Sequence, residues 1–302
     1  MSQTVDPFQF KADDGAQIAA WRLTAEGPPN TPPRAVVQIA HGMAEHMARY
    51  ERLGRALAGA GFAVYANDHR GHGVSADIHG LGDFGPRGFA GVVDDMGALS
   101  RLARAEHPGA PLVLIGHSMG SFAAQLYLLE HGGDLAALVL SGTAAGDKLL
   151  EAIAAGGGGG RLESFNAAFE PARTPFDWLS RDEAEVDAYV ADPFCGFELT
   201  EASVQSVFQA THGATLDPRL ASVSKTLPVL VISGERDPVT GPGQAFADSL
   251  VDRYRAAGIQ DIEHRVYPGA RHELFNETNR DEVTADLIAW LASALGLDAR
   301  LA

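Results

Sequence analysis

The chain has 302 residues, enough to bury a full core as one domain with an insertion, and its 46% hydrophobic and 21% charged residues are ordinary for a soluble globular protein. Its 39 acidic residues outnumber its 23 basic residues, which gives a formal charge of −16 that repels phosphate backbones and anionic membrane surfaces. The composition therefore argues against nucleic acid as a partner.

The chain contains a single cysteine, Cys195, so no intramolecular disulfide can form. This fits a reducing compartment, and we expect a cytoplasmic protein. Residues 1–14 carry charges and no sustained apolar run, so no signal peptide is expected. The longest apolar stretches, such as 135–140, have the length of a buried strand and fall far below the roughly 20 residues that span a bilayer. We expect no stable membrane insertion.

Short aliphatic runs alternate with longer stretches that place apolar residues three or four positions apart. This pattern is typical of an α/β fold, in which helices cover both faces of a mostly parallel sheet. The predicted strands are 18–23, 35–40, 62–67, 112–116, 135–141, 229–233 and 262–267. The predicted helices are 50–60, 89–107, 118–131, 244–257 and 281–295.

The loop at 41–46, with the sequence His-Gly-Met-Ala-Glu-His, follows the predicted strand 35–40. A loop there can supply a backbone N–H to a developing oxyanion, and we expect Met43 to be that donor. Taken alone, the loop would be interpreted as a simple turn from strand to helix. The loop at 68–73, Asp-His-Arg-Gly-His-Gly, resembles a metal site but lacks a fourth ligand, which favours a polar structural loop. We expect no metal and no cofactor.

A serine nucleophile is predicted at Ser118. The apolar strand 112–115 runs into Gly-His-Ser-Met-Gly at 116–120 and then into the helical stretch 122–130. A nucleophile elbow needs a strand, a strained turn with small flanking residues, and a helix whose N-terminus faces the oxyanion. All three parts are present in this order, so Met119 is the expected second oxyanion donor. The alternative is a glycine-rich turn capped by a serine.

The alternation of strands and helices fails between residues 143 and 222. We interpret this stretch as a cap inserted between a first core segment, 1–142, and a second, 223–302. The glycine tract 156–160 lacks the Lys-Ser/Thr ending of a phosphate-binding loop, so it favours a flexible connection over a nucleotide site.

A serine needs a base, and the base needs a carboxylate that orients it. Asp237 is the candidate acid, because it lies on the loop after the strand 229–233 and Pro238 fixes a turn directly after it. Glu235 on the same loop is the competitor, and a solvated loop acid is the alternative for either residue.

His272 is the candidate base, because it lies on the loop after the strand 262–267, at the sheet edge where such folds place their ligand groups. Five of the other histidines are expected to have structural or supporting roles, since one of the five lies inside a strand and the other four precede the serine. These are His264, His41, His69, His72 and His117.

These motifs together resemble the monoacylglycerol lipase and lysophospholipase branch of the α/β-hydrolases, over nearly the whole chain. The matching segments are HGMAEH at 41–46, Arg49-Tyr50, DHRGHG at 68–73, GHSMG at 116–120, ERDPV at 235–239 and ARHE at 270–273. The resemblance implies a mostly parallel eight-stranded sheet with a helical cap between its sixth and seventh strands.

The same resemblance implies a triad of Ser118, Asp237 and His272, with Met43 and Met119 as oxyanion donors. Ala44 and Ser121 stand where the family often has glycine. Neither removes a catalytic group, although Ala44 is expected to alter the backbone of the loop 41–46.

The substrate class is expected from the family and the cap. We expect an ester of a lipid-like substrate, such as a monoacylglycerol or lysophospholipid, cleaved through an acyl-enzyme. Phe165 and Phe208 are the candidate acyl-tunnel residues, and most of the other cap aromatics are expected to form the cap's own core. Alternatives are a small-ester carboxylesterase, an aminopeptidase, or a ligand-binding protein without turnover. Epoxide hydrolases and dehalogenases need a carboxylate where Ser118 stands, which disfavours them.

Overall fold

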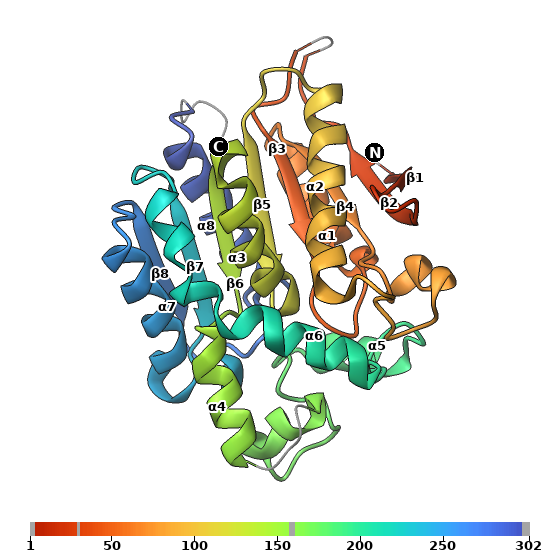
Figure 1. Cartoon of the computed structure of the whole chain (residues 1–302), viewed down its shortest axis with the longest axis vertical. Helices are drawn as coiled ribbons and strands as arrows, with labels where there is room; N and C mark the ends of the chain where they lie inside the picture. Colours follow the sequence, from red (N-terminus) through yellow and green to blue (C-terminus); the bar gives the residue numbers. More distant parts are fainter. Residues whose placement is uncertain (1–3, 29–30, 157–160, 298–302) are drawn as a thin grey trace.

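An eight-stranded sheet forms the centre of the computed structural model, which describes residues 4–28, 31–156 and 161–297 (Figure 1). The strand order is β1-β2-β4-β3-β5-β6-β7-β8. The pairs β1–β2 and β2–β4 are antiparallel, and the remaining pairs are parallel. The strands are β1 (Asp6–Lys11), β2 (Gln17–Leu23), β3 (Val36–Ala40), β4 (Ala63–Asn67), β5 (Leu112–His117), β6 (Leu135–Ser141), β7 (Val229–Gly234) and β8 (Ile262–Tyr267).

Helices cover both faces of the sheet, and the sheet separates the apolar core into two layers. Residues of α2 (Gly88–Glu106), α3 (Met119–His131) and α7 (Ala245–Ala256) pack in one layer. Residues of α1 (Glu51–Gly59) and α8 (Arg280–Ala294) pack in the other. The inner strands β3, β4, β5 and β7 are buried along their whole length, as expected for parallel strands covered on both sides. The predicted mostly parallel, eight-stranded α/β sheet is therefore confirmed.

Helices α4 (Gly146–Gly156), α5 (Glu183–Ala191) and α6 (Glu201–His212) lie together beyond the ends of the strands (Figure 1). They belong to the stretch 143–222, and its described parts, 143–156 and 161–222, contain helices and turns but no strand. Residues 157–160 of the predicted flexible glycine tract lie outside the described residues. Within the described ranges, no helix is both long and apolar enough to cross a membrane.

Candidate active site

Ser118 lies at the sharp turn between β5 and α3, in a strained backbone conformation with φ 50° and ψ −121°. The two glycines of the motif allow this turn. A Cβ on Gly116 would lie 2.5 Å from the Gly120 carbonyl oxygen, and one on Gly120 would lie 2.3 Å from that of Ala40. The Ser118 N–H donates to the Ser141 carbonyl at the end of β6 (2.9 Å). The sequence Gly-x-Ser-x-Gly thus holds a partly exposed serine at the edge of the sheet.

The loops after β7 and β8 bring Asp237 and His272 into direct contact. His272 Nδ1 lies 2.9 Å from Asp237 Oδ2, and both side chains are buried. Burial opposes protonation of His272, but the Asp237 carboxylate outweighs it and raises the pKa of His272 above its ordinary 6.5. His272 Nε2 has no hydrogen-bond partner among the described residues. It is therefore free to accept a proton, as a general base must.

Gly142, directly after β6, connects the serine and the histidine. Its neighbour Ser141 accepts the hydrogen bond from the Ser118 N–H. A Cβ on Gly142, which has a positive φ of 58°, would lie 2.7 Å from His272 Cε1. Any larger residue at this position would push the imidazole away. The sequence pattern did not single out this glycine, because no motif marks it.

Glu235, the competing carboxylate, points elsewhere. Its Oε2 accepts a hydrogen bond from the Gly269 N–H (2.7 Å), and the residue is exposed. Asp237, in contrast, also accepts from the Val239 N–H (2.9 Å) through its other oxygen, which fixes its orientation toward His272. The geometry favours Asp237 as the partner of the base.

The loop 41–46, called the oxyanion loop below after its predicted role, lies beside Ser118. A Cβ on Gly42 would lie 3.1 Å from Ser118 Cβ, and Met43 and Met119 line one cavity with Ser118. Ala44 has a positive φ of 53°, which explains why glycine suits this position. The chain accepts this conformation because the Ala44 N–H donates to His72 Nε2 (3.1 Å) and its carbonyl accepts from the Tyr189 hydroxyl (2.8 Å).

The loop 68–73 supports the oxyanion loop through two hydrogen bonds, one at His69 and one at His72. His72 holds Ala44, and His41 Nε2 accepts from the His69 N–H (2.9 Å). Burial lowers the pKa of His69 to about 3 and that of His72 to about 4, so both imidazoles are neutral near pH 7. Arg70 pairs with the buried Asp95 (2.7 Å). These contacts agree with the interpretation of this segment as a polar structural loop.

Arg49 forms a buried ionic link that the sequence analysis missed. Its guanidinium contacts Glu45 of the oxyanion loop (2.8 Å) and, through Nη2, Oε2 of Glu273 (2.7 Å), the residue after His272. Burial opposes ionisation of Glu273, but the nearby guanidinium lowers the pKa of Glu273 below its ordinary value. Burial raises the pKa of Glu45. One cation therefore ties the oxyanion loop to the loop that carries His272.

Replacing Arg49 by methionine is expected to destabilise the fold by about 3 to 5 kcal/mol, because two buried acidic groups lose their cation. Urea denaturation of both proteins measures this difference in the free energy of unfolding. The matched control is Arg101→Met, which removes an ion pair to Asp13 whose side chains are both more than half exposed (55% and 69%). That variant should unfold at nearly the wild-type midpoint. Equal losses in the two variants would contradict a special role for Arg49.

A narrow apolar cavity opens at Ser118, and residues of the predicted cap, 143–222, line most of it. It has about 70 Å³ of free volume. Both candidate tunnel residues, Phe165 and Phe208, line it, as does Trp178, whose ring centroid lies 4.7 Å from that of His272. Leu149, Leu150 and Ile153 of α4 complete the apolar wall. Among the other cap aromatics, Phe176 and Tyr189 pack against each other (centroids 5.0 Å apart), whereas Phe197 packs against His72 outside the cap (5.1 Å).

Comparisons with known proteins match most of the chain. A model of the serine aminopeptidase S33 family of hydrolases matches residues 31–279. The chain is 34% identical over 281 residues to a monoacylglycerol lipase of Mycolicibacterium smegmatis, covering 88% of this chain and 91% of that protein. It is 30% identical over 266 residues to the monoglyceride lipase of Homo sapiens, covering 82% of this chain and 78% of that protein.

Among solved structures, a thermostable carboxyl esterase from Bacillus coagulans, in complex with glycerol, has a TM-score of 0.83 and 29% sequence identity to this chain. The similarity covers 97% of this chain and 99% of that one. These findings confirm the α/β-hydrolase fold and the resemblance to monoacylglycerol lipases that the motifs indicated.

Proposed function

Because the chain belongs to the serine aminopeptidase S33 family of hydrolases, we propose that it cleaves the carboxylic ester of a monoacylglycerol or lysophospholipid. Ester hydrolysis of a lipid-like substrate is the activity that its relatives share by name. The observation that supports the substrate class is the apolar cavity of the cap, which opens at Ser118. A water-filled polar cleft would suit a small hydrophilic ester instead.

The proposed reaction has two steps. The Ser118 hydroxyl attacks the ester carbonyl while His272 Nε2 accepts its proton, and Asp237 stabilises the resulting imidazolium. The backbone N–H groups of Met43 and Met119 donate to the oxyanion of the tetrahedral intermediate. The Met119 N–H suits this role because Met119 is the first residue of α3, where a backbone N–H has no acceptor within the helix.

The intermediate then expels the alcohol, which takes the proton from His272, and leaves an acyl group on Ser118. Water attacks this acyl-enzyme with His272 again as base, which releases the fatty acid and restores the serine.

A substrate panel tests the proposed activity. Purified protein is assayed with monoacylglycerols, lysophospholipids, short-chain esters and aminoacyl amides. We expect the highest kcat/KM with one of the two lipid classes. A preference for short esters would make the protein a small-ester carboxylesterase, and a preference for the amides would make it an aminopeptidase.

The acyl chain length is expected to control the rate. Each methylene buried in the cavity contributes about 0.8 kcal/mol, so two added carbons should raise kcat/KM about tenfold from acetyl esters toward medium chains. The gain appears in KM if burial is equal in the ground and transition states, and in kcat if it aligns the carbonyl. Assays are run below the concentration at which the substrate forms micelles. A profile that peaks at acetyl or propionyl esters would contradict a lipid-type substrate.

The cap phenylalanines give a sharper form of the same test. Phe208 lines both the cavity at Ser118 and a wider outer cavity of about 520 Å³. Phe208→Ala or Phe165→Ala should therefore flatten the chain-length profile, because the acyl chain loses a close wall. The matched control is Phe194→Ala, since Phe194 is 40% exposed and lines neither cavity. An unchanged profile in all three variants would remove these residues from the tunnel.

The cytoplasm is the compartment that we propose, since the lone cysteine excludes an intrachain disulfide. Fractionation of the source cells, with the protein followed by antibody, tests this. Recovery from an extracellular or membrane fraction would contradict it.

A further inference from the structure

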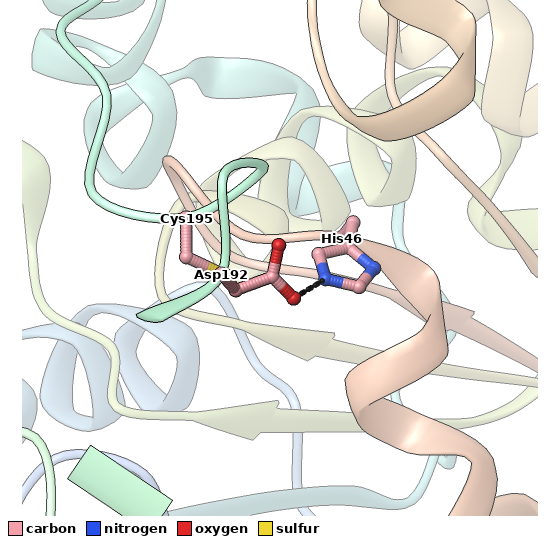
Figure 2. Close-up of side chains that lie close together, drawn as sticks. All are labelled: His46, Asp192 and Cys195. Carbon is pink, nitrogen blue, oxygen red and sulfur yellow. Dashed lines mark hydrogen bonds and ion pairs between the residues drawn. The ribbon is translucent and has the colours of Figure 1, made fainter. Parts of the chain in front are cut away.

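Three potential metal ligands lie where the oxyanion loop meets the cap: His46, Asp192 and Cys195 (Figure 2). His46 Nε2 lies 2.9 Å from Asp192 Oδ2. These two atoms and Cys195 Sγ all lie within 4.8 Å of one another. His46 ends the oxyanion loop, whereas Asp192 and Cys195 belong to the turn after α5. Two segments that are far apart in the sequence thus contribute to one cluster.

The turn after α5 presents its two side chains in a fixed arrangement. The Cys195 N–H donates to the Asp192 carbonyl (3.0 Å), and the Phe194 N–H donates to Asp192 Oδ1 (2.8 Å). Asp192 Oδ1 is therefore engaged within the turn, and Oδ2 faces His46. The next residue, Gly196, donates its N–H to the Ala44 carbonyl (2.9 Å), which holds the turn against the oxyanion loop. Supporting hydrogen bonds of this kind orient the ligands of metal sites.

The spacing of the three atoms is close to what a zinc ion requires. Zinc bonds of about 2.0 to 2.1 Å to nitrogen and oxygen and 2.3 Å to sulfur place tetrahedral ligands about 3.3 to 3.6 Å apart. To bind zinc, His46 Nε2 and Asp192 Oδ2 must move slightly farther apart than their present 2.9 Å, and Cys195 Sγ, which lies within 4.8 Å of both, must stand about 3.6 Å from each. Side-chain rotations can provide this, since the side chains of His46 and Asp192 are 15% and 29% exposed. The exposure also leaves room for water as a fourth ligand.

The donor set and the local charge both favour zinc over other common cations. One thiolate, one imidazole and one carboxylate suit a borderline-soft ion, whereas Mg²⁺ and Ca²⁺ prefer oxygen donors alone. The charged groups that act on Cys195 are Arg49 on one side and Glu45, Asp192 and Glu273 on the other. Acidic groups therefore outnumber the single guanidinium around the cluster. We propose that His46, Asp192 and Cys195 form a zinc-binding site that links the oxyanion loop to the cap.

Titration with Co²⁺ tests this site directly, because thiolate-bound cobalt absorbs in the near ultraviolet. Cys195 is the chain's one cysteine, so a thiolate-to-cobalt band can arise from no other residue. In protein freed of metal by a chelator, we expect the band to saturate at one equivalent and to disappear when Zn²⁺ is added. Zn²⁺ should also raise the Tm of the wild-type protein.

Single substitutions distinguish this site from adventitious binding. Cys195→Ser should abolish both the cobalt band and the zinc-dependent rise in Tm, while circular dichroism shows the fold intact. His46→Gln should weaken Zn²⁺ binding at least tenfold, measured by calorimetry. The matched control is His264→Gln, because His264 also pairs with an aspartate, Asp248 (3.0 Å), but at a different place. The proposal fails if wild-type protein shows no thiolate band in a large excess of Co²⁺, or if His46→Gln binds Zn²⁺ as tightly as wild type.

Discussion

Replacing Ser118 by alanine is expected to abolish ester hydrolysis, with a loss in kcat on the order of 10⁶. The reason is geometric, since the elbow between β5 and α3 presents this hydroxyl to the cavity that Met43 and Met119 also line. A fluorophosphonate probe should label the wild-type protein at Ser118, as located by mass spectrometry of the digested protein, and should leave the alanine variant unlabelled.

The matched control is Ser121→Ala on the first turn of α3. The Ser121 hydroxyl is buried and donates to the Ser118 carbonyl (2.6 Å), and its oxygen lies 2.8 Å from Thr143 Oγ1, so it is not available to attack a substrate. That variant should still be labelled at Ser118. Circular dichroism and Tm show whether Ser118→Ala remains folded. Labelling at another serine, or hydrolysis by folded Ser118→Ala protein, would disprove the assignment.

The sequence pattern predicted the inner strands β3, β4, β5 and β7 well because they are short, largely apolar runs that are buried along their whole length. All seven strands and five helices that the pattern indicated are present, with ends within one residue of their predicted positions. The sequence pattern did not predict strand β1. It pairs with β2 alone at the edge of the sheet, most of its residues are exposed, and Phe10 is its one buried residue. Pro7 also counts against a strand except at an edge.

In the site, too, some features could be predicted from the local sequence and others could not. The turn that carries Ser118 could be predicted because its motif and the flanking strand and helix all lie within residues 112–130. The link from Arg49 to Glu273 joins residues 224 positions apart. No local pattern reveals such a contact, because it depends on two loops meeting at one edge of the folded sheet.

Ala44 shows how a departure from the family pattern can be explained by the structure. Glycine tolerates its positive φ, whereas alanine in this region costs roughly 1 to 2 kcal/mol. Tyr189 and Gly196 of the cap both donate to its carbonyl, and His72 accepts from its N–H. Tyr189 and Gly196 thus hold Ala44 in a conformation that alanine rarely adopts, which ties the position of the predicted oxyanion donor, Met43, to that of the cap.

The acid of the predicted triad can be identified by substituting Asp237 and Glu235, which lie two positions apart on the same loop. Asp237→Asn is expected to lower turnover on the order of 10⁴, because the amide no longer holds the productive tautomer of His272 or stabilises its cation. Asp237 Oδ2 contacts His272 Nδ1 in the structure (2.9 Å). Glu235→Gln is the matched control, since this exposed side chain contacts the Gly269 N–H instead. It should keep nearly wild-type turnover, and the reverse result would transfer the role to Glu235.

The pH profile separates this electrostatic role from general damage to the site. Since Asp237 raises the pKa of His272 above 6.5, and the base must be neutral to accept a proton, kcat/KM of the wild-type protein should fall on acidification with a midpoint above pH 6.5. In Asp237→Asn the carboxylate is lost while burial of the imidazole continues to oppose protonation, so the pKa of His272 falls. The acid limb measured on the residual activity should therefore move to lower pH, whereas Glu235→Gln should leave its midpoint in place. An acid limb that stays fixed in Asp237→Asn would mean that another group sets the ionisation of the base.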